Sequence, residues 1–397
     1  NRQSQRARLM SISSMIIKRY CMLHAVILLK YSVGRSTAFQ PLHLIPTTTT
    51  YTTFQKRTKT MPQTTKTTTT TNTALPSSQT PNDNPEDEKT WRLAHVTSPG
   101  AEYTLRSQNA LPTVFIHGLD SSSQTWSSVQ SELSTASIAV DVRGCGVSRM
   151  GDRDDFGIDT VVEDVKKTLS LHELLQRKSG GGTKRVILVG HSMGAKIATY
   201  YATKYPEDVA ALVLEDMDIR RRPVTANPIP LDMDVVRFFN RRFATLDDAV
   251  EKLTRAGYPS DRIEKWVREG RVRKIQQIVG QGDEEEEEEE GCWSDVNPEF
   301  RALSYERFCD NESATTALKD IACWLKGADA PFPCHLLIAD DEMTICDNES
   351  VEEMCQIMGS MLRVQRFEGA AHSIHNSKQE QFLELLEDIV SNASANK

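Results

Sequence analysis

Ser192 lies between two glycines, in the sequence Gly190-His191-Ser192-Met193-Gly194, where an apolar run gives way to a helical pattern. A serine in a sharp strand-to-helix turn exposes its hydroxyl above the sheet, and small residues two positions away let neighbouring backbone approach closely. The pattern therefore predicts a serine nucleophile in a turn supported by Gly190, His191 and Gly194. A solvated serine in an ordinary glycine-rich connection is the alternative interpretation.

A serine hydroxyl is a weak nucleophile at neutral pH, and histidine, with an unperturbed pKa of about 6.5, is its usual base. His372 follows the strand-like residues 362–367 and precedes the last helical pattern, so we predict that it is the base. His375 is the alternative base, although we expect it at a helix start or beside the substrate. His335 falls inside an apolar run and is predicted to be packed there.

Charge that develops on the substrate oxygen needs preorganised N–H donors. The backbone amide of Met193 can supply one of them. The loop after the apolar residues 113–116 continues with His117, Gly118 and Leu119. We predict that the amide of Leu119 is the second donor, that Gly118 permits the tight turn, and that His117 supports it.

These residues need elements that bring them to one place. Short apolar runs alternate with helical patterns, which is typical of a mostly parallel sheet covered by helices, an α/β fold. The runs occupy residues 113–118, 137–142, 185–190, 211–216, 335–340 and 362–367. Sites in such a sheet form at the carboxyl ends of the strands, so the loops that follow the runs are expected to hold the functional residues.

Four motifs, FIHG, DVRGCGVS, LVGHSMGAK and GAAHSIH, occur in this order between residues 113 and 375. Together they resemble the α/β-hydrolase fold, which implies a triad in the chain order serine, acid, histidine. Within that superfamily the chain is most similar to small bacterial acyl esterases and mitochondrial α/β-hydrolase-domain proteins, which have a lysine at the position of Lys196. The resemblance implies a structural role for the turn from Asp141 to Ser148. The segment 215–223 departs from these esterases and leaves the substrate class open.

The resemblance also implies a carboxylate at the end of the strand that follows the nucleophile. Asp216 takes that position and is the preferred partner of His372. The loop after residues 335–340 is the region where many α/β-hydrolases keep this carboxylate, so Asp341 and Glu342 are the alternative acids. Asp218 is expected to be solvated or paired with an arginine.

The helical segment 219–331 lies between two parts of the predicted core, 91–218 and 332–397. In the α/β-hydrolase fold such an insertion is a lid that shapes the acyl pocket and excludes water, although a packing role alone is the alternative. Thr245 and Ser260 are predicted to cap helices in it. At its entrance stand three arginines that could bind an anionic substrate group or pair with nearby acids: Arg220, Arg221 and Arg222.

Residues 1–90 differ in composition from the rest of the chain. The first 82 residues contain eleven Lys and Arg and no Asp or Glu, whereas the remainder has a net charge of −19. A basic and apolar stretch after Met15, the sequence Ala38-Phe39-Gln40-Pro41 and a threonine-rich, acid-free tract at 47–73 resemble a signal plus transit peptide for a plastid. A mitochondrial presequence, a secretory signal and a mistranslated upstream region are the alternatives.

The remaining patterns limit the function classes. The eight cysteines form no C-x-x-C pair and no zinc-like spacing, so neither a metal nor another cofactor is predicted. The acidic body does not favour nucleic-acid binding, and the apolar core of the leader is too short for a stable membrane span. The glutamate run at 283–290 is expected to be a solvated insertion.

We expect a carboxylesterase- or lipase-like serine hydrolase that cleaves a small acyl ester or thioester; the sequence does not give its oligomeric state. A ligand receptor on the same fold with little turnover, and a C–C bond hydrolase or lyase, are the alternative functions.

Overall fold

The computed structural model describes residues 93–98, 111–172, 175, 184–275, 291–311, 313–328, 331–340, 342 and 344–395. The expectations for the leader 1–90, for the acidic run 283–290 and for Asp341 fall outside the described residues. The plastid address and its mitochondrial alternative therefore stay predictions.

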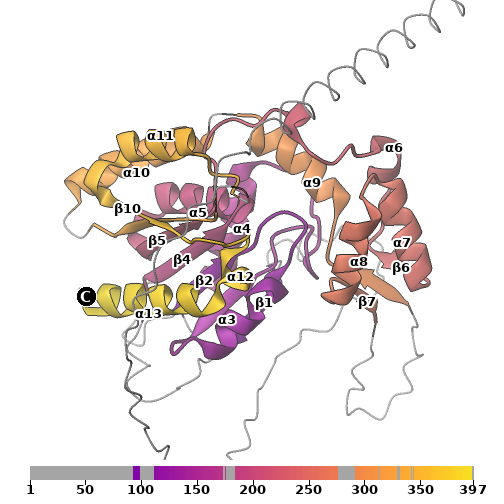
Figure 1. The fold of residues 1–397 in the computed structure, drawn as a ribbon, viewed down its shortest axis with the longest axis horizontal. Helices are drawn as coiled ribbons and strands as arrows, with labels where there is room; N and C mark the ends of the chain where they lie inside the picture. The colour runs from indigo at the N-terminus through magenta and orange to yellow at the C-terminus, as the bar shows by residue number, and fades with distance from the viewer. Residues whose placement is uncertain are drawn as a thin grey trace, which may run out of the picture. The chain divides into compact units, whose positions relative to one another are not determined.

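A seven-stranded sheet with the strand order β1-β3-β2-β4-β5-β9-β10 forms the centre of the described structure (Figure 1). Its strands are β1 (His95–Ser98), β2 (Thr113–Ile116), β3 (Ser137–Val140), β4 (Val186–His191), β5 (Val209–Glu215), β9 (Cys334–Ile338) and β10 (Leu362–Arg366). All neighbours are parallel except β1 with β3. The six predicted runs all form strands, and the predicted α/β fold with a mostly parallel sheet is confirmed. The short, half-buried β1 lacks a pattern that would have predicted it.

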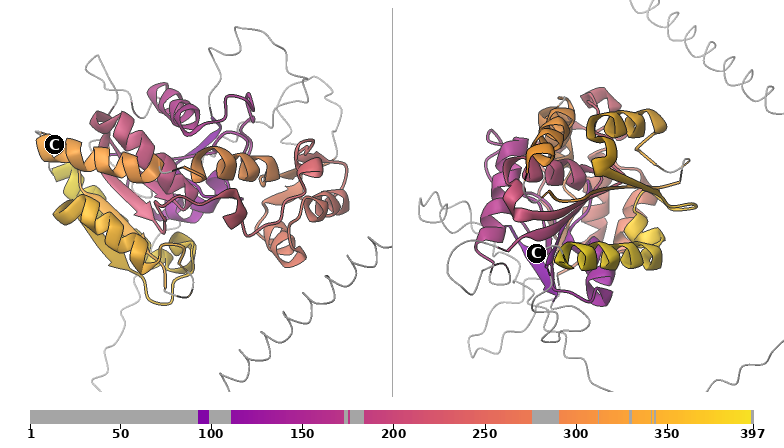
Figure 2. Two further views of the ribbon diagram at one scale, coloured as in Figure 1. Left: turned by 90° about the horizontal axis from the view of Figure 1, so that it is seen from above. Right: turned by 90° about the vertical axis from the view of Figure 1, so that its left-hand side faces the viewer.

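Helices cover both faces of this sheet (Figure 2). The helices are α3 (Ser127–Glu132), α4 (Ile158–Ser170), α5 (Met193–Lys204), α10 (Ser313–Gly327), α11 (Asn348–Met358), α12 (Ile374–Ser377) and α13 (Gln379–Ala395), with short turns η2 (Ser123–Trp126), η4 (Pro206–Asp208), η5 (Val224–Ala226) and η7 (Gly359–Met361). Alternate side chains of a strand point to opposite faces. In β2, Val114 and Ile116 therefore join the apolar cluster of α4, α5 and α10, whereas Phe115 joins that of α3 and α13.

A smaller unit lies between β5 and β9 in the sequence. It contains an antiparallel sheet in the order β6-β8-β7, with β6 (Arg242–Phe243), β7 (Val272–Lys274) and β8 (Cys292–Ser294), and the helices α6 (Met233–Val236), α7 (Leu246–Arg255) and α8 (Ser260–Arg268). An apolar cluster from Ile229 to Val296 holds these elements together. We call the described residues between 229 and 296 the lid, after the predicted role, which stays a prediction; Figure 1 shows them gathered at one end of the large sheet.

The rest of the segment 219–331 belongs to the main core. Helix α9 (Pro298–Ser304), the π-helical turn η6 (Tyr305–Cys309) and α10 follow the lid. These elements contribute to the apolar cluster that contains α5, through Phe300, Phe308 and Leu318. The apolar stripe of α10 thus faces the main core. The segment 219–331 is therefore divided between two apolar clusters, that of residues 229–296 and that of the main core.

One of the two predicted helix caps in the lid is correct. The Thr245 side chain accepts a hydrogen bond from the amide of Asp248 at 3.1 Å, as an N-cap does. Ser260 is instead the first residue of α8, and Pro259 occupies the cap position. Pro259 has the extended backbone of an N-cap, with φ −70° and ψ 146°, but its side chain makes no capping hydrogen bond.

Candidate active site

Ser192 forms the turn between β4 and α5. Its backbone has φ 55° and ψ −121°, and its amide donates to the carbonyl oxygen of Glu215 at 2.8 Å. A non-glycine residue with positive φ costs conformational energy and persists only where the surroundings hold it. The predicted strand-to-helix turn is thus present, with a serine at its sharpest point.

The two flanking glycines are required by close backbone packing. A Cβ atom added to Gly190 would lie 2.4 Å from the carbonyl oxygen of Gly194, and one added to Gly194 would lie 2.3 Å from that of Ile116. Both distances are shorter than any normal contact. Any larger residue at either position would push α5 away from the sheet.

The structure brings His372 and Asp216 together. The ring nitrogen Nδ1 of His372 lies 2.5 Å from Oδ2 of Asp216, and these residues are 156 positions apart in the sequence. The Asp216 side chain is fully buried, whereas that of His372 is 32% exposed. With Nδ1 held by the carboxylate, Nε2 is the ring atom free to serve as a base.

Several donors surround the Asp216 carboxylate. The amides of Ala339 and Ile345 each donate to it at 3.1 Å, and the hydroxyl of Thr344 donates as well. Burial would raise the pKa of Asp216, but the hydrogen bonds from His372 and Thr344 outweigh burial and hold that pKa below its ordinary value. Asp216 is therefore ionised at neutral pH and can stabilise a protonated His372.

Of the two alternative acids, Glu342 is exposed, and Asp341 lies outside the described residues. The neighbouring Asp340 accepts from the amide of Gly369 at 2.7 Å and donates its own amide to Ala370 at 3.1 Å. This part of the later loop orders the turn before His372.

The predicted oxyanion loop lies directly against the nucleophile. A Cβ atom on Gly118 would be 3.0 Å from the Cβ of Ser192. The amide of Val142 donates to Nε2 of His117 at 3.1 Å, so Nδ1 carries the proton and donates to the carbonyl oxygen of Gly118 at 2.8 Å. Burial lowers the pKa of His117 to about 4, which keeps this ring neutral at pH 7.

Fixing the Gly118 carbonyl also orients the amide of Leu119, because both belong to one planar trans peptide and point in opposite directions. Met193 is the first residue of α5, so its amide has no acceptor within the helix. The two predicted oxyanion donors thus come from two segments that meet at Ser192: the loop after β2 and the start of α5.

His191 connects the nucleophile turn to the histidine loop. Its Nε2 donates to the carbonyl oxygen of His372 at 3.1 Å, and the two ring centroids are 4.7 Å apart. Burial lowers the pKa of His191 to about 3, so the ring is a neutral donor. His191 therefore contacts the backbone of His372, not the proton that the His372 ring would transfer.

A second buried carboxylate–histidine pair, Glu215 with His375, was not predicted. Both side chains are fully buried, and His375 donates to Glu215 from Nδ1 at 2.8 Å and from its amide at 2.9 Å. The Trp126 ring stacks on His375 with centroids 4.0 Å apart. His375 lies at the start of α12, which is one of the two positions expected for it. Glu215 ties the loop of His372 to the strand that also receives the amide of Ser192.

Glu215→Gln is expected to lower the free energy of unfolding at pH 7 by about 3 kcal/mol, because it leaves a buried histidine without its charged partner. Burial would raise the pKa of Glu215, but His375 lowers it below the ordinary value. The stabilisation is therefore present above a pH of about 4.3 and disappears as the pH falls through the lowered folded-state pKa. Urea unfolding at pH 7 and pH 3.5 measures this difference.

Glu352→Gln, on the exposed side of α11, is the matched control and should change neither value. A Glu215→Gln variant as stable as the wild type at pH 7 would mean that the pair does not hold the loop.

The three arginines at the start of the insertion are paired with acids. Arg220 contacts Asp218, Asp347 and Glu349 at 3.0, 2.6 and 2.9 Å, Arg221 contacts Asp310 at 2.8 Å, and Arg222 contacts Asp218 at 3.1 Å. These contacts favour the paired interpretation over an anion-binding one. The buried Lys196 donates to the carbonyl oxygen of Arg220 at 3.2 Å and so attaches this segment to α5.

The turn from Asp141 to Ser148 has the expected structural contacts. The Asp141 carboxylate accepts from the amides of Ser123 and Val147 at 2.6 and 2.9 Å, and Arg143 pairs with Asp164 at 2.5 Å. These contacts occupy the carboxylates of both Asp141 and Asp164. The turn therefore holds loops in place at the same edge of the sheet.

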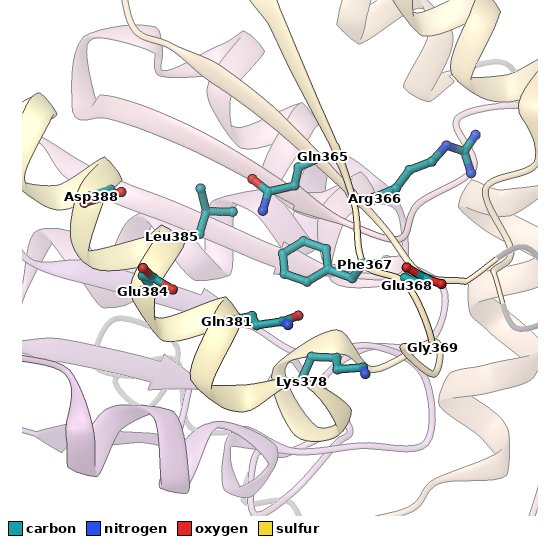
Figure 3. Close-up of a pocket in the computed structure, with 10 residues that line it drawn as sticks. All are labelled: Gln365, Arg366, Phe367, Glu368, Gly369, Lys378, Gln381, Glu384, Leu385 and Asp388. Carbon is teal, nitrogen blue, oxygen red and sulfur yellow. The ribbon is translucent and has the colours of Figure 1, made fainter. Parts of the chain in front are cut away.

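A polar surface groove of about 850 Å³ lies between the end of β10 and α13 (Figure 3). Phe367, Lys378 and Glu384 are among the residues that line it, and none of the candidate catalytic residues does so. The groove is therefore separate from the site around Ser192. Within the described part of the chain there is no cluster of side chains suited to a metal ion and no helix long and apolar enough to cross a membrane.

A profile of the alpha/beta hydrolase family matches residues 113–385, a span that contains every candidate residue of the site. The chain belongs to the alpha/beta hydrolase family.

Individual relatives are more distant. Ethanol acetyltransferase 1 of Cyberlindnera jadinii is 27% identical over 192 residues, which cover 45% of this chain and 51% of that protein. Protein phosphatase methylesterase 1 of Candida albicans is 31% identical over 118 residues, 29% of this chain and 31% of that protein. The match thus spans about half of the first relative and about a third of the second. The peroxisomal alpha-beta-hydrolase Lpx1 of Saccharomyces cerevisiae has a similar fold, with a TM-score of 0.50, 14% identity and coverage of 76% of this chain and 82% of that one.

Proposed function

We propose that this chain is a serine hydrolase that cleaves a small carboxylic ester or thioester through an acyl-enzyme. The observation that carries the proposal is the 2.5 Å contact between His372 Nδ1 and the buried Asp216. The backbone of His372 accepts from His191, the residue before Ser192 in the strained strand-to-helix turn. A base with one nitrogen held by a carboxylate is the arrangement that activates a serine hydroxyl.

In the proposed reaction, Ser192 Oγ attacks the acyl carbon while His372 Nε2 takes the hydroxyl proton. Asp216 stabilises the imidazolium, and the amides of Leu119 and Met193 donate to the oxyanion. His372 then gives the proton to the departing alcohol or thiol. A water molecule, activated by the same histidine, hydrolyses the acyl-enzyme and regenerates the serine.

Transfer of the acyl group to an alcohol is a second candidate function, favoured by the similarity to an ethanol acetyltransferase. It needs the same acyl-enzyme and differs only in the acceptor. Adding ethanol to the assay distinguishes the two, because a transferase forms an ethyl ester in place of the free acid.

The experiment that tests the proposal is labelling with a fluorophosphonate, followed by turnover of esters and thioesters with acyl chains of graded length. We expect labelling and multiple turnovers on at least one short or medium acyl chain. Labelling with a single turnover would favour the receptor alternative. Inert simple esters together with consumption of a ring-derived diketone would favour C–C bond hydrolysis.

A further inference from the structure

Three non-glycine residues of the described chain have a positive φ: Ser192 at 55°, Asp216 at 45° and Asp120 at 54°. The first two are the candidate nucleophile and acid. Strained backbone of this kind clusters at functional sites, where the surrounding structure maintains it. Asp120 directly follows Leu119, the residue whose amide is proposed to bind the oxyanion.

Side chains from the lid and from α9 converge on Asp120. The hydroxyl of Tyr258 donates to Oδ1 at 2.8 Å, and Nη1 of Arg301 donates to Oδ2 at 2.6 Å. Nη1 of Arg271 donates to the backbone carbonyl of Asp120 at 2.7 Å, and Arg262 lies 3.7 Å from the carboxylate. Asp120 is 7% exposed, so water does not replace these partners.

The Gly118–Leu119 peptide is therefore held from two directions. His117 fixes the carbonyl of Gly118 from within the core. On the other side, the lid fixes both the side chain and the carbonyl of Asp120. If the contacts from the lid were lost, Asp120 could relax to a negative φ, which would rotate the Leu119–Asp120 peptide and displace Leu119, whose amide is the proposed donor.

We propose that Asp120 is a positioning residue for the amide of Leu119, and that through it the oxyanion hole depends on docking of the lid residues Tyr258 and Arg271. The inference rests on the proposed serine-hydrolase function. It gives the lid a role in catalysis beyond shaping a pocket, because a donor misplaced by about 1 Å can cost about 10²-fold in rate.

Two variants test the coupling. Asp120→Asn keeps a residue that tolerates positive φ but removes the charge that faces Arg301. Tyr258→Phe removes one hydrogen bond from the lid side and leaves the ion pair intact, so it remains informative if Asp120→Asn folds poorly. The matched control is Trp293→Phe, which removes a different hydrogen bond between lid and core, from Trp293 Nε1 to the carbonyl of Gly146 at 2.9 Å.

We expect Asp120→Asn to lower kcat by about 10- to 100-fold and Tyr258→Phe by about 3- to 10-fold, with KM within about threefold of the wild type. An alkyl boronic acid, which forms a tetrahedral adduct with the serine, should bind more weakly in proportion to the loss of kcat. Trp293→Phe should change kcat by less than about twofold. If these hydrogen bonds only helped to pack the lid, their loss would instead raise KM, and all three variants would show the same change.

If the wild type turns over and both Asp120→Asn and Tyr258→Phe retain its kcat and boronate affinity, the inference is wrong while the proposed function stands. Equal losses of kcat in the Trp293→Phe control would also overturn it. A wild type that neither turns over esters nor binds the boronate would overturn the proposed function and this inference together.

Discussion

Replacing Ser192 by alanine is expected to lower kcat for ester hydrolysis by about 10⁶-fold. The hydroxyl is the only group in the candidate site that can form the acyl-enzyme, and neither His372 nor Asp216 can substitute for it. Steady-state turnover of the best ester in the proposed panel measures the loss. The unfolding midpoint should stay close to that of the wild type, because the change removes one oxygen atom from a partly exposed side chain.

Ser131→Ala, at an exposed position of α3, is the control and should leave turnover unchanged. Comparable turnover in wild type and Ser192→Ala would end the serine-hydrolase proposal, whatever the state of the histidine and the acid.

Asp216→Asn is expected to lower kcat by about 10⁴-fold. An amide at this position accepts a hydrogen bond without the charge that stabilises the imidazolium, and it can also present an N–H group to Nδ1 and so select the wrong tautomer of His372. His372→Ala should cost a similar factor, with His375→Ala far milder in rate. Steady-state kinetics of the folded variants, checked by their unfolding midpoints, give these values.

Asp341→Asn and Glu342→Gln are the matched carboxylate controls and should cost little. The assignment of the acid fails if either of them cripples turnover while Asp216→Asn stays near the wild-type rate.

The sequence predicts the large sheet well because its buried strands are continuous apolar runs, such as the run that becomes β4. The sequence leaves the acidic partner of His372 ambiguous for a physical reason. Strands β5 and β9 are parallel neighbours in the sheet, so the loops that follow them lie at the same edge. Only the direction of a side chain decides between Asp216 and the later loop. Spacing along the chain does not encode that direction.

The contact between Glu215 and His375 joins residues 160 positions apart, and considering each residue only with its sequence neighbours does not predict it. Glu215 ends an apolar run and is counted with the strand. His375 is expected as an alternative base, at a helix start or beside the substrate, but not as the partner of a carboxylate. Two adjacent acids, Glu215 and Asp216, together with two histidines three residues apart, could have indicated two parallel pairs. The contacts of Asp120 had no such signal, because its partner Arg301 is 181 residues away.

The sequence patterns also do not predict the three-stranded sheet of the lid. Strands of two or three residues, such as β6 and β7, are too short to show an alternation of apolar and polar residues. Helix α10 has an apolar stripe, but the sequence does not say whether that stripe faces the lid or the core. The structure places it against α5, so α10 packs with the main core.

Mass spectrometry of the acylated protein is the most direct test of the central claim that Ser192 carries the acyl group. Trypsin releases residues 186–196 as one peptide, in which Ser192 is the only serine. After an acid quench during turnover of a slow ester, this peptide should gain the mass of the acyl group in the wild type, gain it far more slowly in Asp216→Asn, and never gain it in Ser192→Ala. Sustained turnover with no acylated peptide, or with the acyl group on a different residue, would contradict the account.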